Sequence, residues 1–356
     1  MNVGIYIHIP FCKSRCIYCG FYSTTNKELK ERYVDALIRE IHMRKDDFAR
    51  LGTSLSPSST STVYFGGGTP SSLSVCDIER IVGALESTFN GTPSEVTLEM
   101  NPDDVTKDYI KAVRQMGINR ISMGIQTFDD SRLQFIRRRH NASQAEKAVM
   151  TIREEGIHNA SIDLMFGFPN QTMDEWVTDI DKAIALHPTH ISAYSLMYEK
   201  DTPLFRMLQK GEINQIDDET SLAMYTELIN RLTANGYEHY EISNFAMPGY
   251  RSVHNSSYWH DTPYLGFGAA AHSYNKDTRS WNIPDLKKYI ESIESGVLPS
   301  ESEVIDADTH YNDLITTALR TREGLNLDDL PQKYREYALV NARKSISEHL
   351  LEATDS

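Results

Sequence analysis

Tyr6-Ile-His-Ile-Pro-Phe-Cys12-Lys-Ser-Arg-Cys16-Ile-Tyr-Cys19 is the stretch that most constrains what this chain can be. Its first residues predict a short hydrophobic strand, and its cysteines have the spacing Cys-x3-Cys-x2-Cys. Three thiolates on one tight loop can hold three irons of a four-iron, four-sulfur (4Fe-4S) cluster. Because such clusters normally take four cysteines, a set of three predicts an open fourth iron that can bind a small molecule.

The cysteine spacing alone also allows other interpretations. Structural zinc sites use cysteines two to four residues apart, but they require four Cys or His ligands. His8 is a candidate fourth ligand, yet it lies within the predicted strand, and no second cysteine pair follows. Free thiols are the third interpretation. Cys76 stands alone in a predicted helix, where we expect it to be a buried small hydrophobic side chain.

Length and charge restrict the classes of protein that the chain can represent. Its 356 residues suffice for one large barrel-type domain and a smaller module. The formal net charge of −14 argues against a nucleic-acid partner. No apolar run approaches the ~20 residues that span a bilayer, so we expect at most peripheral membrane contact. The cysteine loop begins within the first dozen residues, and reduced cysteines without a leader favour the cytoplasm.

Strands and helices alternate along the first 200 residues. The strands are predicted at 3–9, 62–65, 95–100, 120–125, 161–166 and 190–196, and helices lie between them, beginning with one at 27–50. This alternation predicts a parallel sheet with right-handed crossovers. Six units predict an α/β fold, a partial (β/α)6 TIM-like barrel. We divide the chain into this barrel at 1–200, an aromatic-rich segment at 201–283 and a mainly helical C-terminal module at 284–356.

Polar residues and glycines gather where the predicted strands end. The run Gly66-Gly-Gly-Thr-Pro70 follows the second strand, and Glu99, Gln126 and Asp163 lie at the third, fourth and fifth. The carboxyl ends of parallel strands form the ligand crevice, so we expect these residues to face the same cavity as the cysteine loop. A buried charge is costly without a polar partner, and a shared polar ligand explains the whole set.

The sequence resembles the coproporphyrinogen III oxidase-like branch of the radical S-adenosylmethionine (SAM) superfamily. The resemblance rests on Tyr6–Cys12, Gly66–Pro70, Glu99-Met-Asn-Pro102, Ser122-Met-Gly-Ile-Gln126, Ile162-Asp-Leu-Met-Phe-Gly-Phe-Pro169 and Leu265-Gly-Phe-Gly268. It implies that the cluster is bound by Cys12, Cys16 and Cys19. It implies that SAM is contacted by Tyr6, Tyr18, Gly67, Gly68, Thr69, Glu99, Gln126, Arg138 and Asp163. It also implies a low-potential electron donor, a flavodoxin or a ferredoxin.

Two functions compete within this branch. The oxygen-independent coproporphyrinogen III oxidases are enzymes that decarboxylate two propionates to vinyls, in porphyrin biosynthesis. The HemW-type haem chaperones deliver haem to apo-proteins such as respiratory cytochromes. The oxidases carry a fourth cysteine two residues after the third, where this chain has Phe21, and an N-terminal extension before the first strand. Both differences favour the chaperone. A radical SAM enzyme with another small-molecule substrate is the third reading, because a fold does not fix a substrate.

A second motif supports the chaperone. The run His254-Asn-Ser-Ser-Tyr-Trp259 matches the pattern His-Asn-x-x-Tyr-Trp, which the resemblance associates with haem binding. A neutral imidazole is a good axial ligand for haem iron, and aromatic rings offer flat apolar surfaces. The resulting candidates for binding haem as cargo are His254, Asn255, Tyr258 and Trp259. A hydrogen-bonded histidine in an aromatic core is the alternative. His272 is a further candidate near the SAM site, and a homodimer stays open.

Overall fold

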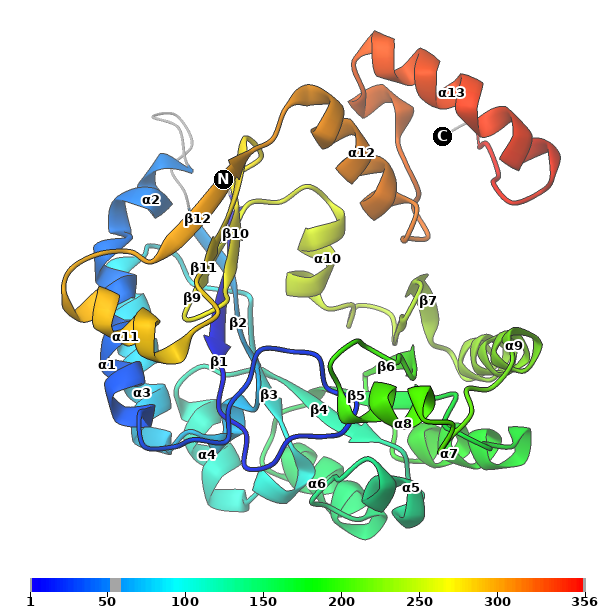
Figure 1. Cartoon of the computed structure of the whole chain (residues 1–356), viewed down its shortest axis with the longest axis horizontal. Helices are drawn as coiled ribbons and strands as arrows, with labels where there is room; N and C mark the ends of the chain where they lie inside the picture. Colours follow the sequence, from blue (N-terminus) through cyan, green and yellow to red (C-terminus); the bar gives the residue numbers. More distant parts are fainter. Residues whose placement is uncertain (1, 52–58, 355–356) are drawn as a thin grey trace.

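The structure is a computed structural model that describes residues 2–51 and 59–354. These residues fold around one twelve-stranded sheet (Figure 1). The strand order is β12-β11-β10-β9-β1-β2-β3-β4-β5-β6-β8-β7. The first six strands are parallel neighbours: β1 (Asn2–Ile9), β2 (Ser59–Gly67), β3 (Glu95–Met100), β4 (Arg120–Gln126), β5 (Asn159–Phe166) and β6 (His190–Ser195). The predicted α/β class with a partial barrel is confirmed.

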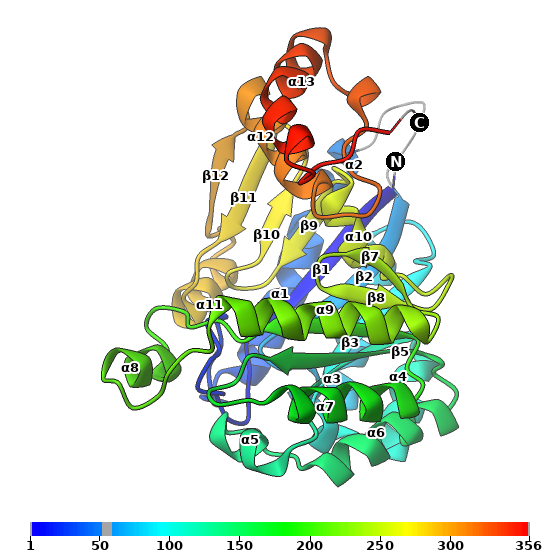
Figure 2. The same cartoon turned by 90° about the vertical axis from the view of Figure 1, so that its right-hand side faces the viewer.

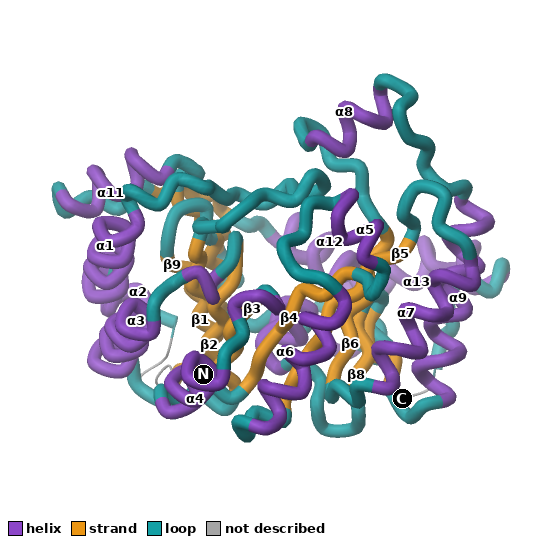
Figure 3. Tube along the Cα trace, turned by 90° about the horizontal axis from the view of Figure 1, so that it is seen from below, coloured by secondary structure: helices purple, strands orange, loops and turns teal. Residues whose placement is uncertain are grey.

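The helices of the first half cover the outer face of the curved sheet, as the view from below shows (Figure 3). They are α1 (Lys30–Met43), α2 (Lys45–Arg50), α3 (Val75–Thr88), α4 (Lys107–Gln115), α5 (Asp130–Phe135), α6 (Ala142–Glu154) and α7 (Met173–Ala185). None of the helices within residues 2–51 and 59–354 is both long and apolar enough to cross a membrane.

The second half extends the sheet at both edges (Figure 2). It contributes β7 (Glu238–Glu241), β8 (Asn244–Ala246), β9 (Tyr264–Phe267), β10 (His272–Tyr274), β11 (Thr278–Asn282) and β12 (Ser300–Val304). Its helices are α8 (Pro203–Gln209), α9 (Asp218–Ala234), α10 (Val253–Trp259), α11 (Leu286–Glu294), α12 (Ala307–Ala318) and α13 (Gln332–Ser347). β9 pairs in parallel with β1, so it is a seventh parallel strand of the barrel.

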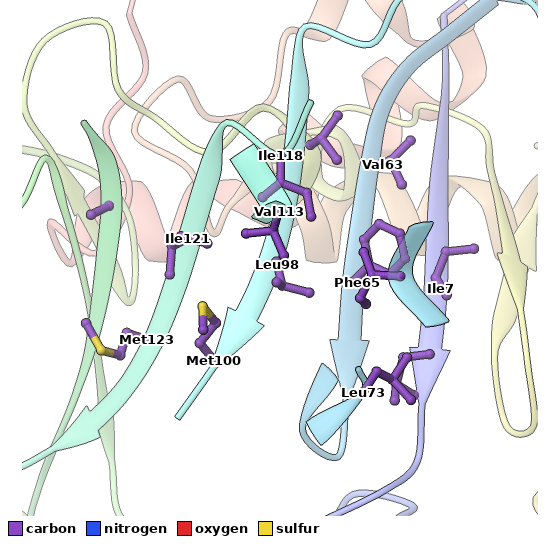
Figure 4. Close-up of a cluster of buried hydrophobic side chains, with 14 of the residues drawn as sticks. Ile7, Val63, Phe65, Leu73, Leu98, Met100, Val113, Ile118, Ile121 and Met123 are labelled. Carbon is purple, nitrogen blue, oxygen red and sulfur yellow. The ribbon is translucent and has the colours of Figure 1, made fainter. Parts of the chain in front are cut away.

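Alternation along the strands separates an aliphatic outer face from a polar interior. In β1, Ile5, Ile7 and Ile9 are fully buried against the helices, whereas Tyr6 lies on the opposite face. The outer core continues along the neighbouring strands, as Figure 4 shows for Val63, Phe65, Leu73, Leu98, Met100, Ile121 and Met123. The interior face of the same strands carries tyrosines, carboxylates and serines. This division leaves the inside of the barrel available for polar ligands.

Glu40 of α1 ties the late strands to the first helix. Its side chain is fully buried and accepts hydrogen bonds from Gly268 N (2.8 Å), the Tyr289 hydroxyl (2.6 Å) and Asn282 Nδ2 (2.7 Å). Arg44 Nη1 lies 3.2 Å from Glu40 Oε1, the oxygen that also accepts from Asn282. With four polar partners, this buried charge is compensated and holds β9, β11 and α11 against α1.

Three expectations from the sequence need correction. Cys76 is exposed: it lies on the face of α3 opposite Ile78 and Leu85, which point into the core. The predicted helix at 27–50 is two helices, α1 and α2, which are separated at Arg44; its side chain donates to Gly266 O at 2.6 Å. The strand predicted at 62–65 is longer, because β2 runs from Ser59 to Gly67, and residues 52–58 lie outside the described chain.

The C-terminal region from residue 284 is mainly helical, with one strand added. β12 pairs antiparallel with β11, so this part of the region continues the main sheet. Farther along, α12 and α13 pack on each other through a small cluster around Tyr311, Leu330 and Ala338. The limits of 1–200, 201–283 and 284–356 as domains stay a prediction.

Candidate functional site

One cavity at the carboxyl end of the parallel strands contains nearly all of the residues expected to bind cluster and SAM. The expected residues that line it are Cys12, Cys16, Tyr18, Cys19, Gly67, Gly68, Thr69, Glu99, Gln126, Arg138 and Asp163. Tyr6 is not among the lining residues. It lies deeper in the barrel, with its hydroxyl 3.1 Å from His8 Nδ1. Residues that follow successive strands in the sequence therefore lie close together around this cavity.

Close backbone packing brings the glycine loop against the cysteine loop. A Cβ on Gly68 would lie 2.8 Å from the Pro10 carbonyl oxygen and 3.0 Å from Cys12 Sγ, so only glycine fits there. Gly68 N donates to Ile9 O at 2.8 Å, and the Thr69 hydroxyl lies 3.5 Å from Cys12 Sγ. This contact fixes the position of the first cysteine at the edge of the cavity.

A buried carboxylate anchors the same loop from the other side. The Asp104 side chain is 2 % exposed and pairs with Lys13, which follows Cys12 directly. Its second oxygen accepts from the Ser71 hydroxyl at 2.8 Å and lies 3.5 Å from Arg139 Nη2. The cysteine loop is therefore tied to the loops after β2 and β3 through Asp104. Sequence reasoning missed this residue, although its place after the third strand is the signal that identified Glu99.

Arg138 spans the cavity between two loops. Its guanidinium donates to Asn101 Oδ1 at 2.7 Å and to the Gly124 carbonyl, and Nη1 lies 3.7 Å from Cys16 Sγ. Asn101 in turn donates to the Thr69 hydroxyl at 3.4 Å. Asn101 was not among the residues expected to contact SAM, yet it connects two of them, Arg138 and Thr69. The arrangement presents a fixed positive charge beside the thiols.

Two carboxyl groups face the interior with few partners. Glu99 accepts from the Tyr64 hydroxyl at 2.8 Å and from Gly67 N at 3.2 Å. Burial raises the pKa of Glu99 to about 7, and the neighbouring Asp163 charge adds to the rise. Burial also raises the pKa of Asp163 to about 6, which its bonds to serines and the nearby Arg120 and Arg138 charges only partly offset. A cationic ligand in the cavity would favour the ionised form of both groups.

The run His254–Trp259, expected to bind haem, lies elsewhere, in α10 at the amino ends of the strands. His254 is fully buried, with Nδ1 2.8 Å from the Thr62 hydroxyl and Nε2 2.9 Å from the Tyr258 hydroxyl. Its ring stacks on Tyr64 with centroids 5.0 Å apart, and burial lowers the pKa of His254 to about 3. Glu95, at the start of β3, holds α10 in place by accepting from Val253 N and His254 N, both at 2.9 Å.

The other candidates of the motif have different surroundings. Tyr258 packs edge-on against Tyr264, whereas Asn255 and Trp259 are partly exposed. The Arg320 guanidinium lies over the Trp259 ring, 4.7 Å from its centroid. His272 is exposed in β10 and does not line the cysteine cavity. The structure therefore separates the cysteine cavity at one end of the barrel from the aromatic motif at the other.

The family model of the Radical SAM superfamily matches residues 6–183, which include every expected cluster and SAM residue. This chain belongs to that superfamily, whose members hold a 4Fe-4S cluster and SAM.

Its relatives make the assignment more specific. It is 34 % identical over 334 residues to Heme chaperone HemW of Bacillus subtilis (strain 168), covering 92 % of this chain and 86 % of the relative. It is 32 % identical to Heme chaperone HemW of Lactococcus lactis, covering 93 % and 84 %. Within the superfamily, the chain belongs to the HemW family.

A solved structure shares the whole fold. Coproporphyrinogen III oxidase (HemN) from Escherichia coli superimposes with a TM-score of 0.84, covering 100 % of this chain and 85 % of that one. The two sequences are 23 % identical, so this similarity establishes the fold alone. The fold therefore does not distinguish the haem chaperones from the coproporphyrinogen III oxidases, the two functions compared above.

Proposed function

We propose that this protein is a haem chaperone, which binds a 4Fe-4S cluster and SAM and delivers haem to an apo-protein such as a respiratory cytochrome. The observation that carries the proposal is the similarity to proteins named Heme chaperone HemW over 92 % and 93 % of the chain. Coproporphyrinogen III oxidase remains the alternative that an experiment must exclude.

Phe21 supports the chaperone at the level of the site. It stands where the resemblance gives the oxidases a fourth cysteine, and its side chain is 72 % exposed at the lining of the cysteine cavity. A phenyl ring offers no ligand and no proton at that place. At this place the cavity of this chain carries an apolar ring, where the oxidases would carry a thiol.

The residues around the cavity have separate tasks in this proposal. Cys12, Cys16 and Cys19 would hold the cluster, which when bound supplies an electron to SAM. Arg138 would bind the SAM carboxylate, because its fixed charge and planar donors suit a carboxylate. Glu99 would ionise when a positively charged group of SAM enters, since burial and the nearby Asp163 charge raise its pKa to about 7. The role of each residue is a proposal that follows from its place in the cavity.

Haem would bind at α10, where the aromatic candidates Tyr258 and Trp259 are both partly exposed. His254 has both ring nitrogens in hydrogen bonds, with Thr62 and Tyr258. An imidazole nitrogen must be free to ligate iron, so His254 would have to leave one of these bonds first. A flavodoxin or ferredoxin as electron donor, a cytoplasmic location and a homodimer stay predictions.

The experiment is a comparison of haem binding and oxidase activity in one preparation. The reconstituted, reduced protein is titrated with haemin by Soret absorbance, and the complex is then mixed with a haem-free cytochrome b acceptor. We expect stoichiometric binding and transfer to the acceptor. The same preparation with SAM, dithionite and coproporphyrinogen III should give no protoporphyrinogen IX. Robust formation of that product would replace the chaperone by the oxidase.

A further inference from the structure

A second group of buried polar residues lies beside Trp259, outside the cysteine cavity. It comprises Glu241 at the end of β7, Asn244 at the start of β8 and Arg320, which follows α12. The backbone brings these segments together, since Ile242 N donates to Arg320 O at 3.1 Å. The cluster therefore sits where the β7–β8 hairpin, the residues after α12 and the end of α10 meet.

Several polar atoms of this cluster are buried without a hydrogen-bond partner. They are Glu241 Oε2, Asn244 Oδ1, Arg320 Nε and Trp259 Nε1, counted against the described residues alone. Buried polar atoms are nearly always paired, so four unpaired atoms in one place indicate a missing polar group or water. Glu241 Oε1 accepts from Ser243 N at 3.0 Å and from Asn244 Nδ2, so only Oε2 lacks a hydrogen bond, whereas both oxygens of the equally buried Glu40 have partners.

Arg320 is the member of the cluster that can receive a ligand. Its guanidinium is held from behind by the Trp259 ring at 4.7 Å, and its side chain is 38 % exposed. Glu241 Oε2 lies 4.0 Å from Arg320 Nη2, which is an ion pair rather than a hydrogen bond. The guanidinium consequently keeps free donors in a fixed orientation, and a carboxylate is the group that matches such donors.

Two exposed apolar side chains belong to residues joined to Arg320. Ile242 is 43 % exposed and donates its backbone N–H to Arg320 O, and Leu319, the preceding residue in the chain, is 46 % exposed. A positive charge within aromatic and aliphatic side chains suits a flat apolar molecule that has a carboxylate at its edge.

We propose that Arg320 binds a propionate group of haem, with Trp259 and Glu241 as the residues that position its guanidinium. This inference rests on the proposed function, which brings haem to α10. It assigns a role to a residue outside the His254–Trp259 motif. The side chains of Ile242 and Leu319 contact the macrocycle, and the propionate takes the Nη donors of Arg320, whose side chain is 38 % exposed.

The test compares two ligands and three proteins. Haemin and haemin dimethyl ester, in which both propionates are esterified, are titrated by Soret absorbance into the wild type, Arg320→Met and Arg322→Met. Arg322 is the matched control, because it is exposed and two residues away, and its only hydrogen bond to residues within 2–51 and 59–354 is from its backbone N to Tyr240 O. We expect esterification to weaken binding to the wild type about tenfold or more, as for the loss of one charge-assisted pair.

Each outcome decides the question. Arg320→Met should bind haemin as weakly as the wild type binds the ester, and should bind the two ligands equally, while Arg322→Met behaves as the wild type. Equal haemin affinity in Arg320→Met and wild type would overturn the proposal and leave water as the partner of the unpaired atoms. A variant that loses affinity for both ligands by the same factor would assign Arg320 a purely structural role. A wild type that binds neither ligand would overturn the chaperone function itself.

Discussion

Glu95 and Glu99 are four residues apart on β3 and illustrate how the two ends of the barrel differ. Glu95, at the amino end, is 3 % exposed and accepts from two backbone N–H groups of α10, both at 2.9 Å. Glu99, at the carboxyl end, accepts from one hydroxyl and one backbone N–H, and burial raises its pKa to about 7. The Glu95 carboxylate holds α10 in place, whereas the charge of Glu99 is incompletely compensated and lies beside the cysteine cavity. A buried carboxylate therefore indicates a binding site only where, as at Glu99, it also lines a cavity and its pKa is raised.

The largest expected effect is on iron incorporation by the cysteine loop, at the carboxyl end of the barrel strands. Replacing Cys12, Cys16 and Cys19 together by Ala should abolish iron incorporation, because no thiolate remains for the cluster. Iron analysis and the absorbance near 400 nm measure the loss. Cys76→Ala is the control and should incorporate iron as the wild type does, since Cys76 is exposed on α3 and does not line the cavity. Iron binding by the triple variant would contradict the assignment.

The second prediction concerns the two glutamates and the free energy of unfolding. Glu95→Gln should destabilise the protein by about 2 kcal/mol, because the buried N–H groups of α10 lose a charged acceptor. Glu99→Gln should stabilise the SAM-free protein at pH 8 by about 1–2 kcal/mol, after discounting for its partial exposure. Its folded pKa lies above the unfolded value, so the wild-type cost grows as pH rises from about 4.5 to about 7. Urea unfolding at pH 5 and pH 8 measures both effects, and equal destabilisation by the two variants would refute the comparison.

The smallest effect concerns His254 and acid stability. Its folded pKa of about 3 lies below the ordinary value of 6.5, so the unfolded chain binds the proton first as pH falls. The contribution of His254 is complete above pH 6.5 and should decrease by about 1.4 kcal/mol at pH 5.5. His254→Gln should therefore show a smaller loss of unfolding free energy between pH 8 and pH 5.5 than the wild type. Identical losses would mean that His254 is solvated rather than buried.

Local patterns in the sequence predicted those features of the fold that depend on residues close together in the chain. The six strand–helix units and the cavity at their carboxyl ends follow from spacing, and even the exposure of Cys76 could have been read from its position opposite Ile78 and Leu85. The pairing of β9 with β1 could not, because no local pattern specifies a partner so distant in sequence. The roles of Asp104 and Arg320 were also hidden, since each depends on loops that only the fold brings together.

The position of Glu40 has a consequence for synthesis of the protein. Its partners Gly268, Asn282 and Tyr289 follow it by 228, 242 and 249 residues. While the ribosome is making the first 200 residues, Glu40 has none of these three donors, and the edge of β1 opposite β2 lacks β9. Long-range parallel pairing is slow, and uncovered strand edges promote aggregation. We therefore expect nascent chains shorter than about 290 residues to depend on chaperones, and the barrel to close only near the end of translation.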